Sequence, residues 1–244
     1  MRNYAEELEK RAAFVKKAME GAGASGIIFN NSGGKDCTLA GAICMHACKN
    51  TVALILPCQS SRNYGEDKTD AEAAAERFGF TNRTIDITAA KEALTASIGA
   101  VADLNSQALT NINPRLRMIC AYAVAAAENR IVVGTGNRSE IHMGYFTKWG
   151  DGACDINPIA DLTVKEVYEF LRYLKAPENI ISKAPSAGLF EGQTDEDEMG
   201  VTYAAIDTYI TGGEIDEKDK AIIDRYHSRS HHKRRMPLWY GVNC

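Results

Sequence analysis

The amino-acid sequence predicts one doubly wound α/β domain, in which a parallel sheet carries helices on both faces. Short apolar runs alternate with longer amphipathic stretches, which is typical of parallel strands joined by right-handed helical connections. The run TVALILPC at 51–58 is apolar without alternation, as expected of a strand covered on both faces. The 244 residues are enough to bury the core of one such domain, and we expect a single domain over 1–244.

The expected helices and strands follow one another from the start of the chain. Leu8, Ala12 and Val15 recur at helical spacing, so the first helix is expected at 4–20. Thr163 and Glu166 have the spacing of a capping box. Further helices are expected at 35–50, 67–79, 89–99, 163–175, 199–211 and 217–230, and strands at 26–30, 51–58, 83–88 and 130–136.

Pro114 is expected to begin one more helix, because a proline at the first helical position loses no hydrogen bond. Arg115 and Arg117 would then lie in the first turn, where positive charge opposes the helix dipole. That placement is unfavourable unless an anion binds beside it, so Arg115 is a candidate anion ligand. The alternative is an exposed arginine that solvent and salt screen.

Ligands of doubly wound sheets bind at the carboxyl ends of the strands. The loops after Asn30, Pro57, Thr88 and Gly134 are therefore the expected place of the site. The segment 136–162 has no helical or strand periodicity, and a loop of that length in a compact domain is usually functional.

The loop SGGKDCT at 32–38 has the composition of a phosphate-binding loop, and two common types of such loop are excluded. GAGASG at 21–26 matches the dinucleotide pattern G-x-G-x-x-G, but it follows a helix and precedes a strand, which reverses the required order. The loop at 32–38 is also not a P-loop, because no glycine stands at the required position before Lys35.

The remaining arrangement is a strand, Ser-Gly-Gly-Lys-Asp and a helix. Gly33 and Gly34 allow backbone N–H groups to approach a phosphate, and the helix that follows adds the positive end of its dipole. Ser32 and Thr38 supply hydroxyl donors. Asp36 would repel a bare phosphate, so we expect it to be a metal ligand or a helix cap, and a capped turn without a ligand is the plain alternative.

A strand, SGGxD and a helix at the head of a doubly wound sheet resemble the PP-loop ATP pyrophosphatases, which split ATP between its α and β phosphates. The rest of the chain closely resembles ammonia-dependent NAD synthetase, through stretches that occur in the order of that family: GTGNRSE (134–140), GYFTKWGDGACDINPI (144–159), KAPSAGL (183–189), DEDEMGVTYAAID (195–207) and HHKRRMP (231–237). FTKWGDG joined to DINP is the specific part of this signature. The resemblance covers nearly the whole chain and implies an adenine nucleotide alpha hydrolase-like fold.

The resemblance implies an enzyme that makes NAD from deamido-NAD, ATP and ammonia. In that family the nicotinate carboxylate attacks the α-phosphorus of ATP, which gives an NAD-adenylate and pyrophosphate, and ammonia then displaces AMP. The resemblance implies Mg²⁺ as cofactor, ATP as co-substrate and a homodimer with the dinucleotide site at the subunit interface. No room is left for a glutamine-hydrolysing domain, so the ammonia is expected to be free or to come from a partner.

The resemblance also implies roles for single residues. Two of them are implied catalytic residues, Asp36 and Lys148. The implied magnesium ligands are Asp36 and Glu140. The implied contacts of deamido-NAD are Arg115, Lys148, Asp155, His232 and Lys233. The implied contacts of ATP are Asn30, Asn31, Ser32, Gly33, Gly34, Lys35, Asp36, Cys37, Thr38, Thr135 and Ser186.

Several of these positions have plainer interpretations. Glu140 alone would be taken for a solvated carboxylate, DINP for an Asx turn, and the basic tail at 225–244 for a solvated terminus. The acidic stretch at 191–198 has no phosphate role and is expected to be an exposed, mobile loop.

The chain departs from the family pattern at a few positions near ATP. Cys37 stands where serine is usual, Ser186 where threonine is usual and Val164 where many members carry lysine. Asn30 and Asn31 replace a glycine and an aliphatic residue. These departures favour, as one alternative, a homologue that binds ATP without catalysis.

Composition disfavours a tRNA-modifying PP-loop enzyme, which needs a basic RNA surface and cysteine pairs. The net charge is −4, and no C-x-x-C pair occurs among the seven cysteines. No apolar run approaches the ~18 residues of a membrane span, and the charged N-terminus does not resemble a signal peptide. We therefore expect a cytoplasmic protein with small-molecule substrates and with neither nucleic acid nor membrane as a partner.

Overall fold

Parallel pairing arranges the strands in the order β3-β2-β1-β4. The computed structural model describes residues 2–183 and 194–241, and within these it contains four strands: β1 Gly26–Asn30, β2 Thr51–Ile55, β3 Thr81–Thr84 and β4 Arg130–Val133. The strand β1 pairs with β2 on one side and with β4 on the other, so Phe29 lies beside both Ala53 and Val133. The chain therefore crosses from β3 at one edge of the sheet to β4 at the other.

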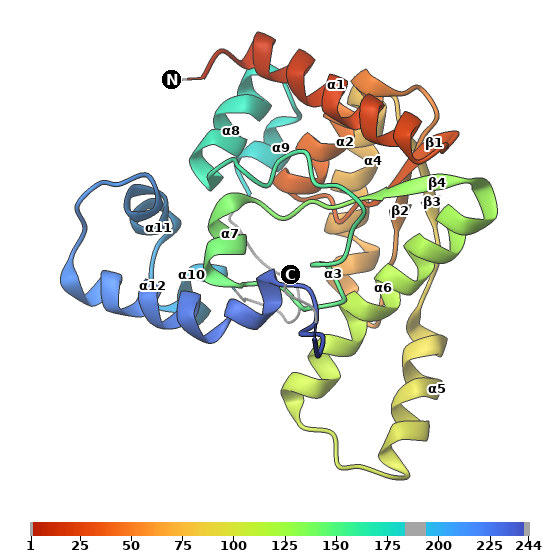
Figure 1. Ribbon diagram of the computed structural model, residues 1–244. Helices are drawn as coiled ribbons and strands as arrows, with labels where there is room; N and C mark the ends of the chain where they lie inside the picture. Colours follow the sequence, from red (N-terminus) through yellow and green to blue (C-terminus); the bar gives the residue numbers. More distant parts are fainter. Residues whose placement is uncertain (1, 184–193, 242–244) are drawn as a thin grey trace.

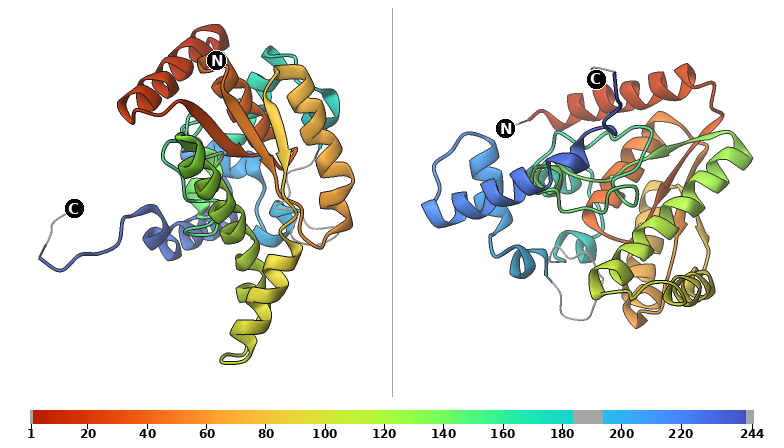
Figure 2. Two further views of the ribbon diagram at one scale, coloured as in Figure 1. Left: turned by 90° about the vertical axis from the view of Figure 1, so that its right-hand side faces the viewer. Right: turned by 60° about the horizontal axis from the view of Figure 1, so that its bottom comes forward.

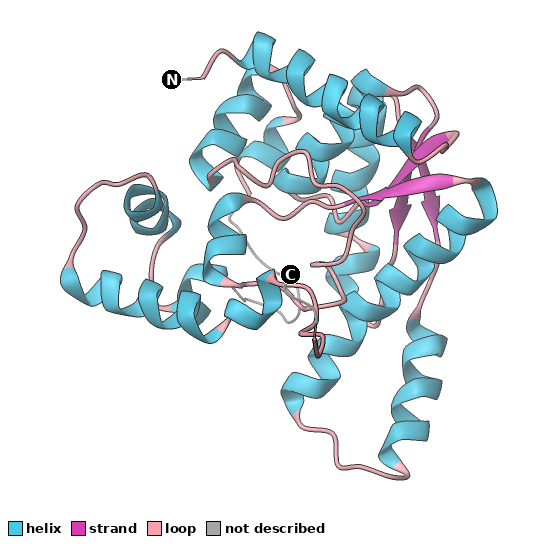
Figure 3. Ribbon diagram, in the orientation of Figure 1, coloured by secondary structure: helices cyan, strands magenta, loops and turns pink. Residues whose placement is uncertain are grey.

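Helices cover both faces of this sheet, which confirms the predicted fold class (Figure 1, Figure 3). On one face α1 packs on α2, which also contacts α4 and α8, and on the other face α6 lies against β1 and β4. The pair α5 and α6 projects from the body of the molecule (Figure 2). The helices are α1 Tyr4–Gly21, α2 Lys35–Ala47, α3 Ser61–Tyr64, α4 Glu66–Phe78, α5 Thr88–Gly99, α6 Ser106–Glu128, α7 Arg138–Met143, α8 Val164–Tyr173, α9 Glu178–Ile181, α10 Asp195–Met199, α11 Tyr203–Ile210, α12 Glu217–Arg229 and the short 3₁₀ helix η1 His231–Arg234.

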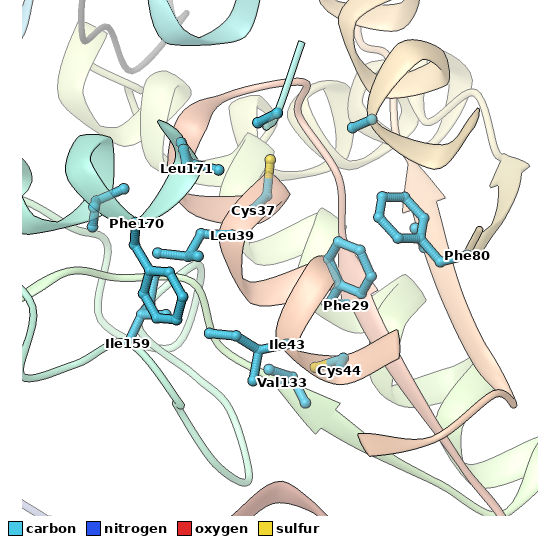
Figure 4. Packing of buried hydrophobic residues seen from close by; sticks show 14 of the residues in the cluster. Phe29, Cys37, Leu39, Ile43, Cys44, Phe80, Val133, Ile159, Phe170 and Leu171 are labelled. Carbon is cyan, nitrogen blue, oxygen red and sulfur yellow. The ribbon is translucent and has the colours of Figure 1, made fainter. Parts of the chain in front are cut away.

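Each face of the sheet has its own hydrophobic core because successive residues of β1 point to opposite sides. Phe29 belongs to the cluster on the α2 and α8 side, where it meets Phe80 edge to face with ring centroids 5.2 Å apart (Figure 4). Ile28 belongs to the opposite cluster with Met118 and Ala121 of α6. A third cluster joins α7, α8, α11 and α12 beside the sheet.

Several element boundaries were predicted wrongly. The strands expected at 51–58 and 130–136 end at Ile55 and Val133, the helix expected at 35–50 ends at Ala47, and the helix expected at 199–211 begins at Tyr203. The strand expected at 83–88 is Thr81–Thr84, because β3 takes its register from β2, which pairs Val52 with Thr81. The helix expected to begin at Pro114 is α6, which begins at Ser106. The Asn105 side chain caps α6 by accepting a hydrogen bond of 2.8 Å from the Ala108 N–H, and Pro114 lies inside the helix.

Arg115 and Arg117 lie in the interior of α6 and not in its first turn, so the helix dipole there does not disfavour them. Their position along the helix therefore no longer indicates an anion site. The capping box at Thr163 and Glu166 is confirmed, with both of its hydrogen bonds present.

The acidic stretch is not an exposed loop where the structure describes it. Asp195 begins the helix α10 and is 3% exposed, and its carboxylate accepts a hydrogen bond of 3.0 Å from the Tyr203 hydroxyl. Residues 191–193 lie outside the described part. No helix of the described chain is both long and apolar enough to cross a membrane.

Candidate active site

The two loops richest in candidate residues meet beside β1. The chain leaves β1 for β2 and β3 on one side and returns to β4 on the other, so the topological switch point lies between β1 and β4. The loop after β1 leads into α2, and the loop after β4 leads into α7. Their residues lie together at the carboxyl end of the sheet, as the sequence predicts.

The glycine loop is held from behind by α4 and by an asparagine side chain. Gly33 has φ +74°, and a Cβ there would overlap the Asp67 carbonyl oxygen and approach the Asp70 Cβ to 2.7 Å. Asn31 is 3% exposed, and its Oδ1 accepts a hydrogen bond of 3.1 Å from the Gly33 N–H while its Nδ2 donates to the Ala71 carbonyl. Asn31 therefore supports the loop from inside the protein.

Asp36 and Glu140 come from the two loops and are joined by one residue. The Asn137 Nδ2 donates a hydrogen bond of 3.0 Å to Asp36 Oδ1, and Asn137 also forms a capping box with Glu140 at the start of α7. Burial raises the pKa of Glu140 well above its usual range, and the negative charge of Asp36 raises it further. Asp36 thus lies close enough to disfavour the charged form of Glu140.

Lys35 provides a positive charge next to this pair. Its Nζ lies 2.7 Å from Asp36 Oδ2, and the side chain is 7% exposed. Burial by itself would lower the pKa of Lys35, but the charges of Asp36 and Glu140 outweigh burial and raise it. The lysine is therefore cationic, and it is bound to the carboxylate that follows it in sequence.

The donor set fits a magnesium ion that shares its coordination with phosphate oxygens. Mg²⁺ is usually held by one or two carboxylates together with substrate phosphates and water. Asp36 and Glu140 supply two such groups, and the capping box uses only Oε2 of Glu140, at 3.0 Å from the Asn137 N–H. The described residues contain no cluster of three or more metal-binding side chains.

A cavity of about 1400 Å³ opens over these residues. Its volume exceeds the roughly 300–1,000 Å³ of a site for one small ligand, so it has room for two substrates. Asn30, Ser32, Lys35, Asp36 and Glu140 line it together with Thr135. Asn30 Oδ1 is buried and has no hydrogen-bond partner in the described chain. Further lysines and arginines also line the cavity: Lys68, Arg117, Lys148, Lys183, Arg225, Arg229, Lys233, Arg234 and Arg235.

Arg117 is a candidate anion ligand that the sequence does not single out. Its guanidinium donates to the Leu56 carbonyl at 3.1 Å and to Asn63 Oδ1 at 3.3 Å. Burial lowers its pKa, and both of these acceptors are uncharged. The sequence could not distinguish Arg117 from Arg115, because both lie on α6 and only the folded structure shows that Arg117 lines the cavity and Arg115 does not.

Two predicted ATP contacts lie beneath the loop. Thr38 is fully buried and its Oγ1 has no partner in the described chain, so it does not line the cavity. Cys37 is 3% exposed and belongs to the hydrophobic core (Figure 4), but unlike Thr38 it also borders the cavity. Its Sγ lies 3.1 Å from the Gly34 carbonyl and 3.4 Å from Ser32 Oγ. Burial raises the pKa of Cys37.

Arg115 and Asp155, predicted contacts of deamido-NAD, lie outside the cavity lining. Arg115 is exposed and donates to the Lys148 carbonyl at 3.4 Å. Asp155 accepts hydrogen bonds from the Val132 N–H at 2.7 Å and from the Tyr122 hydroxyl at 3.1 Å. Within this one chain, both residues support the structure around β4 and α6.

The C-terminal segment lines the cavity, and hydrogen bonds to main-chain carbonyls tie it to the loop after α7. Lys148 Nζ donates to the His232 carbonyl at 2.7 Å. Lys233 Nζ donates to the carbonyls of Gly144 and Phe146 at 2.8 and 2.7 Å, and burial lowers its pKa. Three residues predicted to bind deamido-NAD, Lys148, His232 and Lys233, are therefore linked by hydrogen bonds between the C-terminal segment and the loop after α7. Ser186, a predicted ATP contact, lies outside the described residues.

Comparison with known proteins gives the family of this chain. The family model for NAD synthase matches residues 7–237. The NH(3)-dependent NAD(+) synthetase of Carboxydothermus hydrogenoformans is 42% identical over 96% of this chain and 97% of its own length. The chain belongs to the NAD synthase family. A further NH(3)-dependent NAD(+) synthetase, from Alkaliphilus metalliredigens, is 40% identical over 95% of this chain and 96% of its own length.

Solved structures of NAD synthase relatives share the whole fold. The NMN synthetase from Francisella tularensis superposes with a TM-score of 0.93 at 40% identity and covers 99% of this chain and 100% of its own. The NH3-dependent NAD synthetase from Campylobacter jejuni gives a TM-score of 0.82 at 27% identity and covers 98% of this chain and 99% of its own. These matches confirm the family resemblance and the fold, and make this NAD synthase chain a ligase that forms a C–N bond.

Proposed function

We propose that this NAD synthase chain uses ATP to amidate the nicotinate carboxylate of deamido-NAD with ammonia, giving NAD, AMP and pyrophosphate. The observation that carries the proposal is the meeting of Asp36 and Glu140 beside the glycine loop at the floor of one large cavity. That arrangement suits the splitting of ATP between its α and β phosphates. The family match and the similar NH(3)-dependent NAD(+) synthetases support this function over the tRNA-modifying alternative.

The residues bind and orient the reactants and do little acid–base work. The backbone at Gly33 and Gly34 and the start of α2 favour the anionic pyrophosphate end of ATP. Asp36 and Glu140 would hold the magnesium ion, which supplies charge neutralisation as pyrophosphate leaves. We assign Lys148, which lines the cavity and is fixed to His232, to the carboxylate or phosphate of the nicotinate substrate.

The chemistry needs two exchanges of bonds at the nicotinate carboxylate. A carboxylate oxygen forms a bond to the α-phosphorus while the bond from that phosphorus to the bridging oxygen breaks. The nitrogen of ammonia then bonds to the acyl carbon, the carbon–oxygen bond to AMP breaks, and ammonia loses a proton. Positioning accounts for most of the rate in such a sequence, since the leaving groups are already good.

A mononucleotide is the second candidate substrate. One similar structure, with a TM-score of 0.93, is an NMN synthetase, and Arg115 and Asp155 lie outside the cavity of the single chain. Nicotinic acid mononucleotide carries the same carboxylate and phosphate but lacks the adenosine phosphate part. It would need neither residue.

In a homodimer, Arg115 and Asp155 could contact deamido-NAD bound at the subunit interface. Ile119 and Tyr122 expose 62% and 37% of their surface on the same helix as Arg115, and Tyr122 donates to Asp155. An apolar face of this kind favours association with a second chain. The homodimer and a cytoplasmic location are predictions of the family resemblance.

One assay tests the function and separates the two substrates. The protein is incubated with ATP, Mg²⁺ and ammonium and with either deamido-NAD or nicotinic acid mononucleotide, and the amide product and pyrophosphate are measured. We expect stoichiometric NAD and pyrophosphate, with a higher kcat/KM for deamido-NAD. A higher kcat/KM for the mononucleotide would favour the second candidate, and pyrophosphate release without either amide would contradict the function.

A further inference from the structure

Lys35 occupies a position that is unfavourable for a cation. It is the first residue of α2, where the helix dipole is positive, and its side chain is 7% exposed. Burying an ammonium group is costly unless it is paired. A lysine that is kept there needs compensation, and the contacts of its Nζ show what provides it.

The compensation comes from a carboxylate and two aromatic rings. Lys35 Nζ lies 2.7 Å from Asp36 Oδ2 and is 6.0 Å and 5.7 Å from the ring centroids of Tyr168 and Tyr203. These rings come from α8 and α11, so three separate elements enclose the ammonium group. Both are within the distance at which an aromatic face attracts a cation.

Asp36 Oδ2, the oxygen that Lys35 contacts, is also the oxygen that a metal ion would need. Asp36 Oδ1 already accepts a hydrogen bond from the Asn137 amide, so Oδ2 is the oxygen that is not used by Asn137. Lys35 is bound to Oδ2. An ammonium group and a divalent cation on the same Oδ2 repel each other at close range, so each weakens the binding of the other.

We propose that Lys35 is a built-in counter-ion that holds Asp36 Oδ2 in the metal-free enzyme and that a divalent cation must displace from it. The metal alone therefore binds weakly, and it binds well only when ATP adds phosphate oxygens. Lys35 in this way couples metal binding to ATP binding. This inference rests on the assignment of Asp36 as a metal ligand in the proposed function.

The test is the affinity of the protein for Mn²⁺ alone, measured without ATP by calorimetry or by the EPR signal of free Mn²⁺. Lys35→Met removes the charge and is expected to raise Mn²⁺ affinity at least about tenfold, since one repulsive charge is lost at close range. Lys10→Met is the matched control, because Lys10 pairs with Glu6 at the same 2.7 Å but its side chain is 65% exposed. The control is expected to keep wild-type affinity.

Thermal stability gives a second test of the displacement of Lys35 by a metal ion. In EDTA, Lys35→Met is expected to unfold at a lower temperature than wild type, because the mostly buried Asp36 carboxylate then loses the ammonium group 2.7 Å from its Oδ2. Saturating Mn²⁺ is expected to remove most of that difference. Lys35→Arg keeps the charge and is expected to keep the weak Mn²⁺ affinity.

Equal or weaker Mn²⁺ affinity in Lys35→Met would overturn the proposal, and if that variant does not fold, Lys35→Gln is measured in the same way. Asp36→Asn is expected to weaken Mn²⁺ binding. Wild-type affinity in Asp36→Asn would overturn the metal assignment and this proposal together, whatever the product assay gives. The binding experiment uses neither substrate, so its failure is distinct from a failure of the proposed amidation.

Discussion

Asn137 donates a hydrogen bond of 3.0 Å from its Nδ2 to Asp36 Oδ1, and this bond joins the loop after β4 to the helix that follows β1. Asn137 is fully buried and also caps α7, the helix that carries Glu140. One amide side chain thus sets the distance between the two carboxylates. A metal site built from two loops depends on such a link, because neither loop alone fixes the position of the other.

Gly33→Ala is expected to damage the glycine loop. The residue has φ +74°, which costs an alanine about 1–2 kcal/mol, and the new Cβ would approach the Ala71 N to 2.9 Å and Asp70 Cβ to 2.7 Å. We expect a lower melting temperature and a kcat/KM for ATP reduced by up to about 100-fold, as the phosphate-binding N–H groups shift. Thermal unfolding and ATP kinetics measure the two effects.

Gly34→Ala is the matched control for the fold. Gly34 has φ −82°, and the nearest atom to an added Cβ is Ser32 Oγ at 3.3 Å. Its melting temperature should stay close to wild type. An unchanged melting temperature in both variants would contradict the view that Gly33 is required by its conformation.

Cys37→Ser is expected to leave the affinity for ATP nearly unchanged. The side chain is 3% exposed and borders the cavity, and its Sγ contacts the Gly34 carbonyl, so its main role is to support the loop. We expect the KM for ATP to change less than about threefold, since the hydroxyl makes the same contacts at shorter range. The raised pKa of Cys37 also predicts slow alkylation by iodoacetamide, which mass spectrometry can follow. A large gain in ATP affinity would show that the cysteine had replaced a direct ligand.

Lys233→Met tests whether Lys233 stabilises the fold or only binds substrate. Lys233 Nζ already donates to the carbonyls of Gly144 and Phe146. Its loss should reduce the free energy of unfolding by about 1–2 kcal/mol even without substrate, since two hydrogen bonds from a charged donor disappear. Chemical denaturation of the unliganded protein measures this. Lys220→Met, an exposed lysine on α12, is the control, and equal stability of the two variants would instead favour a role in binding alone.

His142 makes stability depend on pH below neutrality. Burial lowers its pKa to about 4, and the positive charges of His227, Arg234 and Arg138 add to the effect, whereas Asp224 opposes it. The ring stacks on His227 with centroids 4.1 Å apart, and its Nε2 is buried without a partner in the described chain. In the unfolded chain the imidazole binds a proton below pH 6.5, and in the folded protein it does so only near pH 4.

The sign of the effect follows from proton binding. Between pH 6.5 and 4 the unfolded state binds more protons, so the stability contributed by the neutral imidazole is present above pH 6.5 and is lost as pH falls. His142→Phe keeps a ring for the stack and does not titrate. We expect its melting temperature to fall less than that of wild type between about pH 7 and pH 4.5, the range over which the unfolded chain takes up the proton. Parallel curves for the two proteins would contradict the prediction.

The sequence predicts the elements whose signals are local. The capping box at Thr163 is a contact between residues three apart, and it was predicted correctly. The continuous apolar run marks β2, whose start at Thr51 was predicted correctly, whereas its end is at Ile55 and not at 58. The meeting of the loops after β1 and β4 was also predictable, because parallel strands place their carboxyl ends at one edge.

The errors arose where distant contacts decide the structure. The start of β3 depends on its register with β2, which a sequence pattern does not contain. Pro114 looked like a helix start, yet the Asn105 cap and packing of α6 on the sheet override the cost of an internal proline. The carbonyl partners of Lys233 lie far away in sequence and come together only on folding.

Attack of the nicotinate carboxylate on the α-phosphorus of ATP is the central step of the proposed reaction, and oxygen labelling tests it most directly. Deamido-NAD that carries ¹⁸O in its carboxylate is converted with ATP, Mg²⁺ and ammonium, and the AMP is analysed by mass spectrometry. We predict one atom of ¹⁸O in the phosphate of each AMP formed. NAD formed together with unlabelled AMP, or with ADP and labelled inorganic phosphate, would contradict this step.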